Sequence, residues 1–338
     1  MAACAGPPPF ALFALKSDGT LWRWGATSLA PSAGFMPVAG FATATQVDFT
    51  GTSGCAVAGN GSAWCLGTNT YGQIGDGTTN DSRFAWVQVV TSAGGPPLTN
   101  VRQISRGGET TCAVTTANTV WCWGRGASGQ LGNGGVLNSA VPVQVVTGAA
   151  GGAFTDVTQV SASDAHVCAV KTNGSLWCWG RNLDGEIGVG STSGSFIYPT
   201  RVLVNGARSV DVAQGVSCAT LTDDSVRCWG SNANARLGLG TTGGNQTTPA
   251  SPLVSATASL TAVAEVKVGT EVTCARRQNG ELWCWGNRLA QTFAAQYTRS
   301  NFAVTNVSDF CIDEIHPAYT VAGVLHDLNG PVFPLTCP

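Results

Sequence analysis

A pattern of two cysteines, interleaved with tryptophan and ending in glycine, recurs along the chain. In its clearest copy, "CAVKTNGSLWCWG" at residues 168–180, short apolar runs flank an Asn-Gly pair. Asn-Gly between such runs is the strongest short-range signal for a β-hairpin. Because the same hairpin signal returns many times, the sequence predicts an all-β fold assembled from similar units.

Seven such hairpin cores can be aligned, and five of them contain both cysteines. They lie near residues 13–25, 55–67, 112–124, 168–180, 218–230, 274–286 and 324–335. A strand precedes most cores, and a glycine-rich turn and a further short strand follow. Four short strands in a unit of about 50 residues correspond to one propeller blade. We therefore expect a single domain over residues 1–338, a seven-bladed β-propeller with four-stranded blades.

The glycine-rich turns carry the most specific signature of the chain. They read "GTNTYGQIGDGTT" from Gly67, "GRGASGQLGNGG" from Gly124, "GRNLDGEIGVGST" from Gly180 and "GSNANARLGLGTT" from Gly230. The units resemble regulator of chromosome condensation repeats, in which a hairpin ending in Trp-Gly precedes "N-x-x-G-Q-L-G-x-G". The resemblance covers nearly the whole chain and implies a seven-bladed propeller. The first and sixth units depart from it, with "ATSLAPSAGF" and "NRLAQTFAAQ" in place of the turn.

The paired cysteines are expected to form disulfides within blades. Counting outward from the turn at residues 172–174 places Cys168 directly opposite Cys178, within disulfide range. The five pairs are Cys55–Cys65, Cys112–Cys122, Cys168–Cys178, Cys218–Cys228 and Cys274–Cys284. Metal ligation is a competing interpretation, but zinc sites favour two to four residues between paired cysteines. Reduced core cysteines are the other alternative.

Disulfides in this number indicate an oxidising compartment, so we expect a secreted, periplasmic or surface-exposed protein. Cys4, Cys311 and Cys337 remain; Cys311–Cys337 is the favoured pair and Cys4–Cys337 the alternative. The letters "AAC" followed by "AGPPP" also resemble the end of a lipoprotein signal, in which case Cys4 carries a lipid in the native precursor. The given N-terminus has no signal-peptide pattern, and no apolar run approaches the roughly 20 residues that span a bilayer.

Little in the sequence points to catalysis. The net charge of -2 gives no reason to expect nucleic acid as a partner, and no cofactor or metal is expected. His166 is expected to be structural, and His316 and His326 lie in the degenerate last unit. No nucleophile elbow or P-loop is present. The tryptophans of the hairpins, including Trp177 and Trp179, are expected to be core rather than a sugar-binding platform.

The variable loops are where propellers place recognition. Aromatic and arginine side chains in the glycine-rich turns should ring one face of the disc, where they suit protein recognition. The predicted binding residues are Tyr71, Arg125, Arg181, Asp184 and Arg236, although these residues could equally only cap their turns.

Three functions follow from this sequence, in order of preference. The first is a non-enzymatic, secreted or surface-exposed propeller that binds a protein or glycan through one face. The family includes two precedents, an exchange factor for the GTPase Ran and a secreted inhibitor of β-lactamases. The second is a structural subunit of a surface layer, adhesin or filament, with possible self-assembly. The third, an enzyme with its site in the channel, needs facing carboxylates, and acidic residues are too sparse to nominate any.

Overall fold

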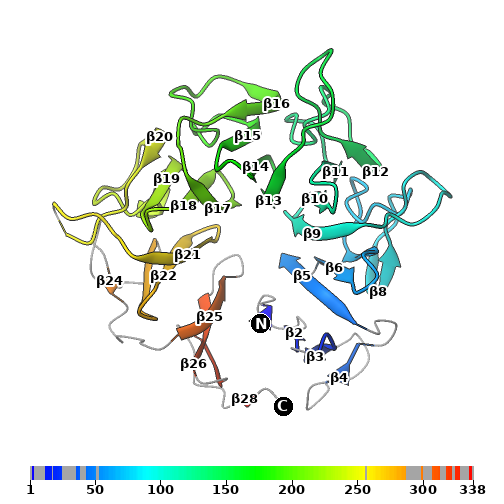
Figure 1. Ribbon diagram of the computed structural model, residues 1–338, viewed down its shortest axis with the longest axis horizontal. Helices are drawn as coiled ribbons and strands as arrows, with labels where there is room; N and C mark the ends of the chain where they lie inside the picture. Colours follow the sequence, from blue (N-terminus) through cyan, green and yellow to red (C-terminus); the bar gives the residue numbers. More distant parts are fainter. Residues whose placement is uncertain are drawn as a thin grey trace.

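The strands of the protein pair into four-stranded antiparallel sheets that stand in a ring around a central axis (Figure 1). The computed structural model describes residues 2–3, 12–16, 18–24, 36–38, 43–50, 53–255, 257–286, 298–299, 307–312, 317–321, 324–327 and 335–336. Within these residues, no helix has the length and apolarity needed to cross a bilayer. The all-β propeller with four-stranded blades is therefore confirmed.

Five blades, numbered 2 to 6 by their hairpin cores, carry the disulfides. Blade 2 contains β5 (Ala44–Thr50), β6 (Ser53–Ala58), β7 (Ala63–Gly67) and β8 (Ser82–Gln88). Blade 3 contains β9 (Val101–Arg106), β10 (Thr110–Thr115), β11 (Val120–Gly124) and β12 (Ser139–Gln144). Blade 4 contains β13 (Val157–Ala162), β14 (His166–Lys171), β15 (Leu176–Arg181) and β16 (Ser195–Arg201). Blade 5 contains β17 (Ala207–Ala213), β18 (Val216–Leu221), β19 (Val226–Ser231), η1 (Ala233–Ala235) and β20 (Asn245–Ala250). Blade 6 contains β21 (Val263–Val268), β22 (Val272–Arg277), β23 (Leu282–Gly286) and β24 (Thr298–Arg299).

The sequence predicts seven blades, of which five carry a cysteine pair; the structure describes these five as blades and does not confirm the number seven. The ends of the chain add two further four-stranded sheets, of which a large part lies outside the described residues. The first contains β1 (Ala2–Ala3), β2 (Leu12–Leu15), β3 (Leu21–Trp24) and β4 (Met36–Pro37), and the last contains β25 (Val307–Ile312), β26 (Pro317–Val321), β27 (Val324–Asp327) and β28 (Leu335–Thr336). Both units lack the cysteine pair of blades 2 to 6 and the glycine-rich turn of blades 2 to 5.

The hairpin register follows the prediction. Cys168 lies opposite Cys178 and Val170 opposite Leu176, and Gly174 takes the left-handed backbone that its turn needs, with φ of +72°. The five predicted disulfides all form, with Cα atoms 4.0 to 4.1 Å apart. Nine of these ten cysteines are completely buried, and Cys284 is 2% exposed. Cys4, Cys337 and the side chain of Cys311 lie outside the described residues.

Side chains of each blade close the free edge of the next blade's inner strand. An inner strand pairs on one side only, which leaves a row of backbone groups without sheet partners. Gln103 Nε2 donates to the carbonyl oxygen of Val160 at 2.9 Å, and Gln103 Oε1 accepts the Val160 N–H at 2.9 Å. Gln46 makes the same two bonds to Ile104 at 2.7 Å each, and Gln159 makes them to Val210. The glutamine amide therefore replaces a peptide group and continues the ladder across the blade boundary.

Tryptophan side chains lock the blades together further out. The indole N–H groups of Trp123, Trp179, Trp229 and Trp285 donate to backbone carbonyls of the preceding blade, at 2.8 to 3.0 Å. The acceptors are the carbonyls of Gln73, Gln130, Glu186 and Arg236, one in each glycine-rich turn. These tryptophans are at most 8% exposed, as a core role predicts. Each therefore fixes the turn of its neighbour.

The other tryptophan of each hairpin departs from the prediction of a fully buried core. Trp22, Trp64, Trp121, Trp177 and Trp283 are only half-buried. Their indole N–H groups donate to side chains of the hairpin turn itself, as Trp177 does to Ser175 Oγ at 3.0 Å. They lie close to the turn, where blades no longer cover them completely.

The two faces of the disc are built from different connections. What we call the loop face carries the turns between the first and second strands and the glycine-rich turns between the third and fourth strands. What we call the turn face carries the short hairpin turns and the connections between blades. Hydrogen bonds join the two kinds of segment on each face, as from the Arg181 N–H to Ala165 on the loop face and from the Thr172 N–H to Asp156 on the turn face.

We expect Gln103→Ala to lower the free energy of unfolding by about 2 kcal/mol, because it strips both partners from the Val160 peptide groups. Urea unfolding of the oxidised protein measures this loss. Gln278→Ala is the matched control, since Gln278 is exposed on the turn face and should change stability by less than about 0.5 kcal/mol. Equal effects of the two variants would contradict the role of Gln103.

Candidate functional site

The glycine-rich turns hold the loop face in one conformation. In three of them an asparagine ties the turn together from inside: Asn69, Asn182 and Asn232 accept the N–H five residues later, at 2.8 to 3.2 Å. Each of these buried amides also donates to a carbonyl nine residues later. A surface built on such turns is presented in a rigid form.

Two of the predicted binding residues meet across the boundary between blades 2 and 3. The Arg125 guanidinium lies 5.3 Å from the centre of the Tyr71 ring and forms an ion pair with Glu109. Glu109, to which it donates a side-chain hydrogen bond, raises the pKa of Arg125. Arg125 remains 40% exposed, so its outer edge stays accessible.

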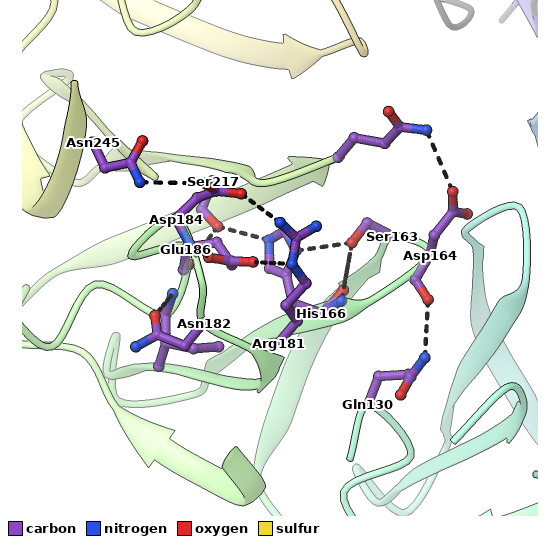
Figure 2. Close-up of polar contacts among 12 residues, drawn as sticks. Gln130, Ser163, Asp164, His166, Arg181, Asn182, Asp184, Glu186, Ser217 and Asn245 are labelled. Atoms are coloured by element: carbon purple, nitrogen blue, oxygen red, sulfur yellow. Dashed lines mark hydrogen bonds and ion pairs between the residues drawn. The ribbon is translucent and has the colours of Figure 1, made fainter. Parts of the chain in front are cut away.

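The second group lies on blade 4 and reaches blade 5, as Figure 2 shows. Arg181 Nη2 lies 2.6 Å from Asp184 Oδ2, and Arg181 Nε lies 3.5 Å from Glu186 Oε1. Asp184 Oδ1 also accepts a bond from Asn245 Nδ2 at 3.2 Å. Arg181 is thus clamped between two carboxylates but is still 35% exposed.

Arg236 differs from the other predicted residues, because it is only 8% exposed. Its guanidinium donates to the carbonyls of Ala233, Gln214 and Thr270. Burial lowers the pKa of Arg236, against the opposing charges of Asp184 and Glu271. Its contacts fasten the turn of blade 5 to blade 6 and leave little of it for a partner.

Four of the five predicted residues therefore form two groups, Tyr71 with Arg125 and Arg181 with Asp184. An aspartate that the sequence did not single out lies between these groups. Asp164 Oδ1 accepts the Glu109 N–H at 3.2 Å, and its Oδ2 lies 3.5 Å from Gln214 Nε2. Glu109, Asp164 and Asn245 have no distinctive motif around them, so only their neighbours in space identify them. Together the two groups form a polar rim on the loop face.

His166 stands behind this rim and is fully buried. Its Nδ1 lies 2.9 Å from Ser163 Oγ and its Nε2 lies 2.9 Å from Ser217 Oγ. Burial, and then the charge of Arg181, lower the pKa of His166 to about 3. A neutral imidazole has one N–H, so one serine hydroxyl must donate to the other ring nitrogen. His166 is therefore a structural link between blades 4 and 5, as Figure 2 shows.

The inner strands of blades 2 and 5 each carry an aspartate with a structural partner. Asp48 accepts the Arg106 N–H at 2.9 Å, and Asp211 accepts the Val268 N–H at 2.6 Å, so both close inner-strand edges. Burial raises the pKa of Asp48 to about 6 and raises the pKa of Asp211. Across the part of the chain that the structure describes, no group of three or more His, Cys, Asp or Glu could hold a metal ion.

Glu186 breaks a repeated pattern in which a glutamine side chain of the glycine-rich turn donates a hydrogen bond to the next blade. In blades 2 and 3 this position is Gln73 and Gln130, whose amide nitrogens donate to the next blade at Gly108 and Asp164. An ionised glutamate cannot donate, and Glu186 Oε1 is buried without a hydrogen bond. Burial raises the pKa of Glu186, despite the hydrogen bonds and the charge of Arg181 that lower it.

We expect Glu186→Gln to stabilise the protein at pH 7.5 by about 1 kcal/mol, because it restores a neutral donor at the boundary between blades 4 and 5. A carboxyl whose folded pKa is raised favours folding when protonated, so the wild type should gain stability as the pH falls toward 4.5 and the difference should shrink. Urea unfolding between pH 4.5 and 7.5 measures both effects. Gln130→Glu is the reciprocal variant and should destabilise blade 3; stabilisation by it would contradict this account.

The contribution of His166 to stability should change with pH in the direction opposite to that of Glu186. Its folded pKa lies below the unfolded value of 6.5, so its contribution is complete above pH 6.5 and is lost as the pH falls toward 3. The difference in unfolding free energy between wild type and His166→Gln should change by about 1.4 kcal/mol per pH unit between pH 6 and 4. Chemical denaturation at several pH values tests this, and parallel curves for the two proteins would rule it out.

Comparison with known proteins agrees with this architecture. The regulator of chromosome condensation (RCC1) repeat matches residues 118–170 in one form and residues 101–130 and 157–186 in another. The ultraviolet-B receptor UVR8 of Arabidopsis thaliana is 31% identical over 140 residues, which cover 40% of this chain and 29% of that protein. The chain thus spans under a third of this relative.

Solved structures share the fold at low identity. Human WBSCR16 superposes with a TM-score of 0.72 at 18% identity, over 95% of this chain and 86% of that one. Yeast RCC1 (Prp20), solved with Kap60 bound, gives 0.70 at 17% identity, over 91% and 77%. The CRINKLY WD40 ectodomain of the Arabidopsis thaliana receptor kinase ACR4 gives 0.55 at 16% identity, over 100% and 96%.

The recurring hairpins, the glycine-rich turns and the ring of four-stranded sheets lead to one assignment. The chain carries regulator of chromosome condensation (RCC1) repeats within residues 101–186.

Proposed function

We propose that the chain is an exported, non-enzymatic propeller that binds a protein partner through its loop face. The observation that carries the proposal is the combination, on this face, of exposed leucines with half-exposed arginines already held in place. Leu183 is 59% exposed and lies between Arg181 and Asp184 in the same turn. Exposed apolar side chains beside arginine are typical of binding hot spots.

A second exposed leucine extends the surface onto blade 3. Leu137 is 81% exposed, and its backbone packs against Gly126, next to Arg125, so closely that a Cβ on Gly126 would come within 2.1 Å of the Leu137 carbonyl oxygen. Val136 beside it is 53% exposed. The rim therefore offers apolar contacts from two neighbouring blades around charged groups.

The rim arginines need little ordering to bind. The carboxylates of Glu109 and Asp184 fix the guanidinium groups of Arg125 and Arg181 before a partner arrives. Side chains held in this way lose less conformational entropy on association. Tyr71 adds a ring beside Arg125, so its placement supports a role in binding. Arg236 is buried beneath the rim and holds the turn of blade 5 in place through its bonds to backbone carbonyls.

Export is supported by the five buried disulfides, which suit an oxidising environment. The similarity to a receptor-kinase ectodomain fits an extracellular location, and the yeast relative solved with Kap60 bound fits protein binding.

We also propose that the two terminal sheets complete a ring of seven blades, with Cys311 paired to Cys337.

The test is capture of partners from the extracellular medium or cell surface of the source, with the oxidised wild-type chain as bait and cross-linked partners identified by mass spectrometry. Leu183→Asp should weaken binding of a captured protein by about tenfold, because it places a charge in the apolar part of the interface. Leu203→Asp is the matched control, since Leu203 is 87% exposed but lies in the connection from β16 to β17 on the turn face.

The two variants separate the outcomes. Loss of binding with Leu183→Asp alone supports the loop face as the binding surface. Loss with Leu203→Asp alone would assign binding to the other face, and binding that neither variant changes would remove the rim from the interface.

A further inference from the structure

Charge is distributed unequally between the two faces of the disc. Among the described side chains, the loop face carries seven acidic and four basic residues. Its acidic residues are Asp76, Asp81, Glu109, Asp164, Asp184, Glu186 and Glu271. The turn face carries seven basic and five acidic residues. A chain with a net charge of only -2 thus separates its charges along the propeller axis.

Most of the basic residues on the turn face have no ion pair. Two of them do: Arg208 pairs with Asp224 at 2.8 Å, and Arg277 pairs with Glu281 at 2.9 Å. Among the described side chains, the other five lie beyond ion-pair distance of any carboxylate. They are Lys16, Arg102, Lys171, Arg201 and Arg227.

Blade 4 shows how these cations are presented. Lys171 Nζ lies 5.5 Å from the centre of the half-buried Trp177 ring and 4.4 Å from that of Phe154. Arg201 lies directly opposite Trp177 on the neighbouring strand and is exposed. Lys16 repeats the arrangement on the first sheet, 4.9 Å from the centre of the Trp22 ring. The ammonium groups of Lys16 and Lys171 therefore lie over aromatic rings of this face.

Within the described part of the chain, three acidic residues of this face have no ion pair; Asp156 accepts a bond from the Thr155 hydroxyl, and the other two accept bonds within hairpin turns. Asp18 accepts bonds from the N–H and hydroxyl of Thr20, and Asp223 accepts the same two bonds from Ser225. These bonds lower the pKa of both carboxyls. These carboxylates keep their charge, and part of their hydrogen-bonding capacity is taken up by their own turns.

We propose that the turn face is a second binding surface, which takes a polyanionic glycan. The cations are spread over blades 1, 3, 4 and 5 instead of being concentrated at one point, so they suit an extended polymer with repeated charges. The half-buried indoles of Trp22 and Trp177 lie beside these cations, and an indole can also contact a sugar ring. The buried disulfides, which suit an exported protein, favour a surface glycan over a nucleic acid.

The proposal can be tested with heparin and polygalacturonate as probes on the oxidised chain, measured by calorimetry at low salt and again at 0.3 M salt. Arg201→Gln and Lys171→Met should each weaken binding about threefold, and the wild type should lose affinity steeply as salt rises. Asp156→Asn, which removes a negative charge from the same face, should tighten binding by a similar factor.

The matched control is Asn133→Asp on the loop face. It makes the same change in net charge as Arg201→Gln, and aspartate can keep the bond that Asn133 Oδ1 accepts from the Gly135 N–H. Its binding should equal that of the wild type. If Asn133→Asp lost as much glycan affinity as Arg201→Gln, net charge alone would explain the loss, and the proposal would be overturned.

Two further outcomes are decisive. Tighter binding to a single-stranded DNA oligomer, or to vesicles of anionic lipid, than to either glycan would assign the surface to another class of partner and overturn the proposal. Protein capture through the loop face should be unchanged in Arg201→Gln, so the failure of one proposal leaves the other standing.

Discussion

The free edge of each inner strand is the constraint that the rest of the structure depends on. A blade has four strands, and its first strand pairs on one side only, with its other edge turned to the axis. The preceding blade supplies the missing partners from Gln46, Gln103 and Gln159, which bond to Ile104, Val160 and Val210. Ser105 and Ser161 accept further N–H groups of the next blade at 3.1 Å. The blades are thus joined by hydrogen bonds that act like a continuation of the sheet.

This closure explains why the loop face can present a defined surface. The glutamines fix the inner strands, the tryptophan N–H groups fix the glycine-rich turns, and the disulfides hold the hairpins between them. Arg125 directly follows β11 and Arg181 is the last residue of β15, so the third strands of their blades set the positions of both arginines. At the boundary between blades 4 and 5, Glu186 occupies the position that Gln73 and Gln130 hold in the turns of blades 2 and 3, and Arg181 compensates the charge of Glu186. The most polar part of the rim therefore lies where the hydrogen bond from a turn glutamine to the next blade is absent.

The sequence predicts the fold well because its signals are local. Asn173-Gly174 sets the turn, the turn sets the register, and the register brings Cys168 against Cys178. The glutamines of the inner strands were not predicted, since a single glutamine in a strand such as "QVSAS" has no local partner. Their meaning lies in contacts about 50 residues away, as between Gln103 and Val160. For the same reason the sequence placed Arg236 among the exposed binding residues, although it is buried against carbonyls of blades 5 and 6.

The unequal charge of the two faces has a structural origin in the two kinds of connection. On the loop face, backbone N–H groups in wide turns need acceptors, and carboxylates such as Asp164 and Asp81 supply them. On the turn face, the connections between blades leave carbonyls that need donors, and Arg102 and Arg208 supply these at the starts of β13 and β21. Part of the unequal charge therefore comes from side chains that satisfy the backbone of their own face. A binding surface on either face can then use a charge that folding already requires.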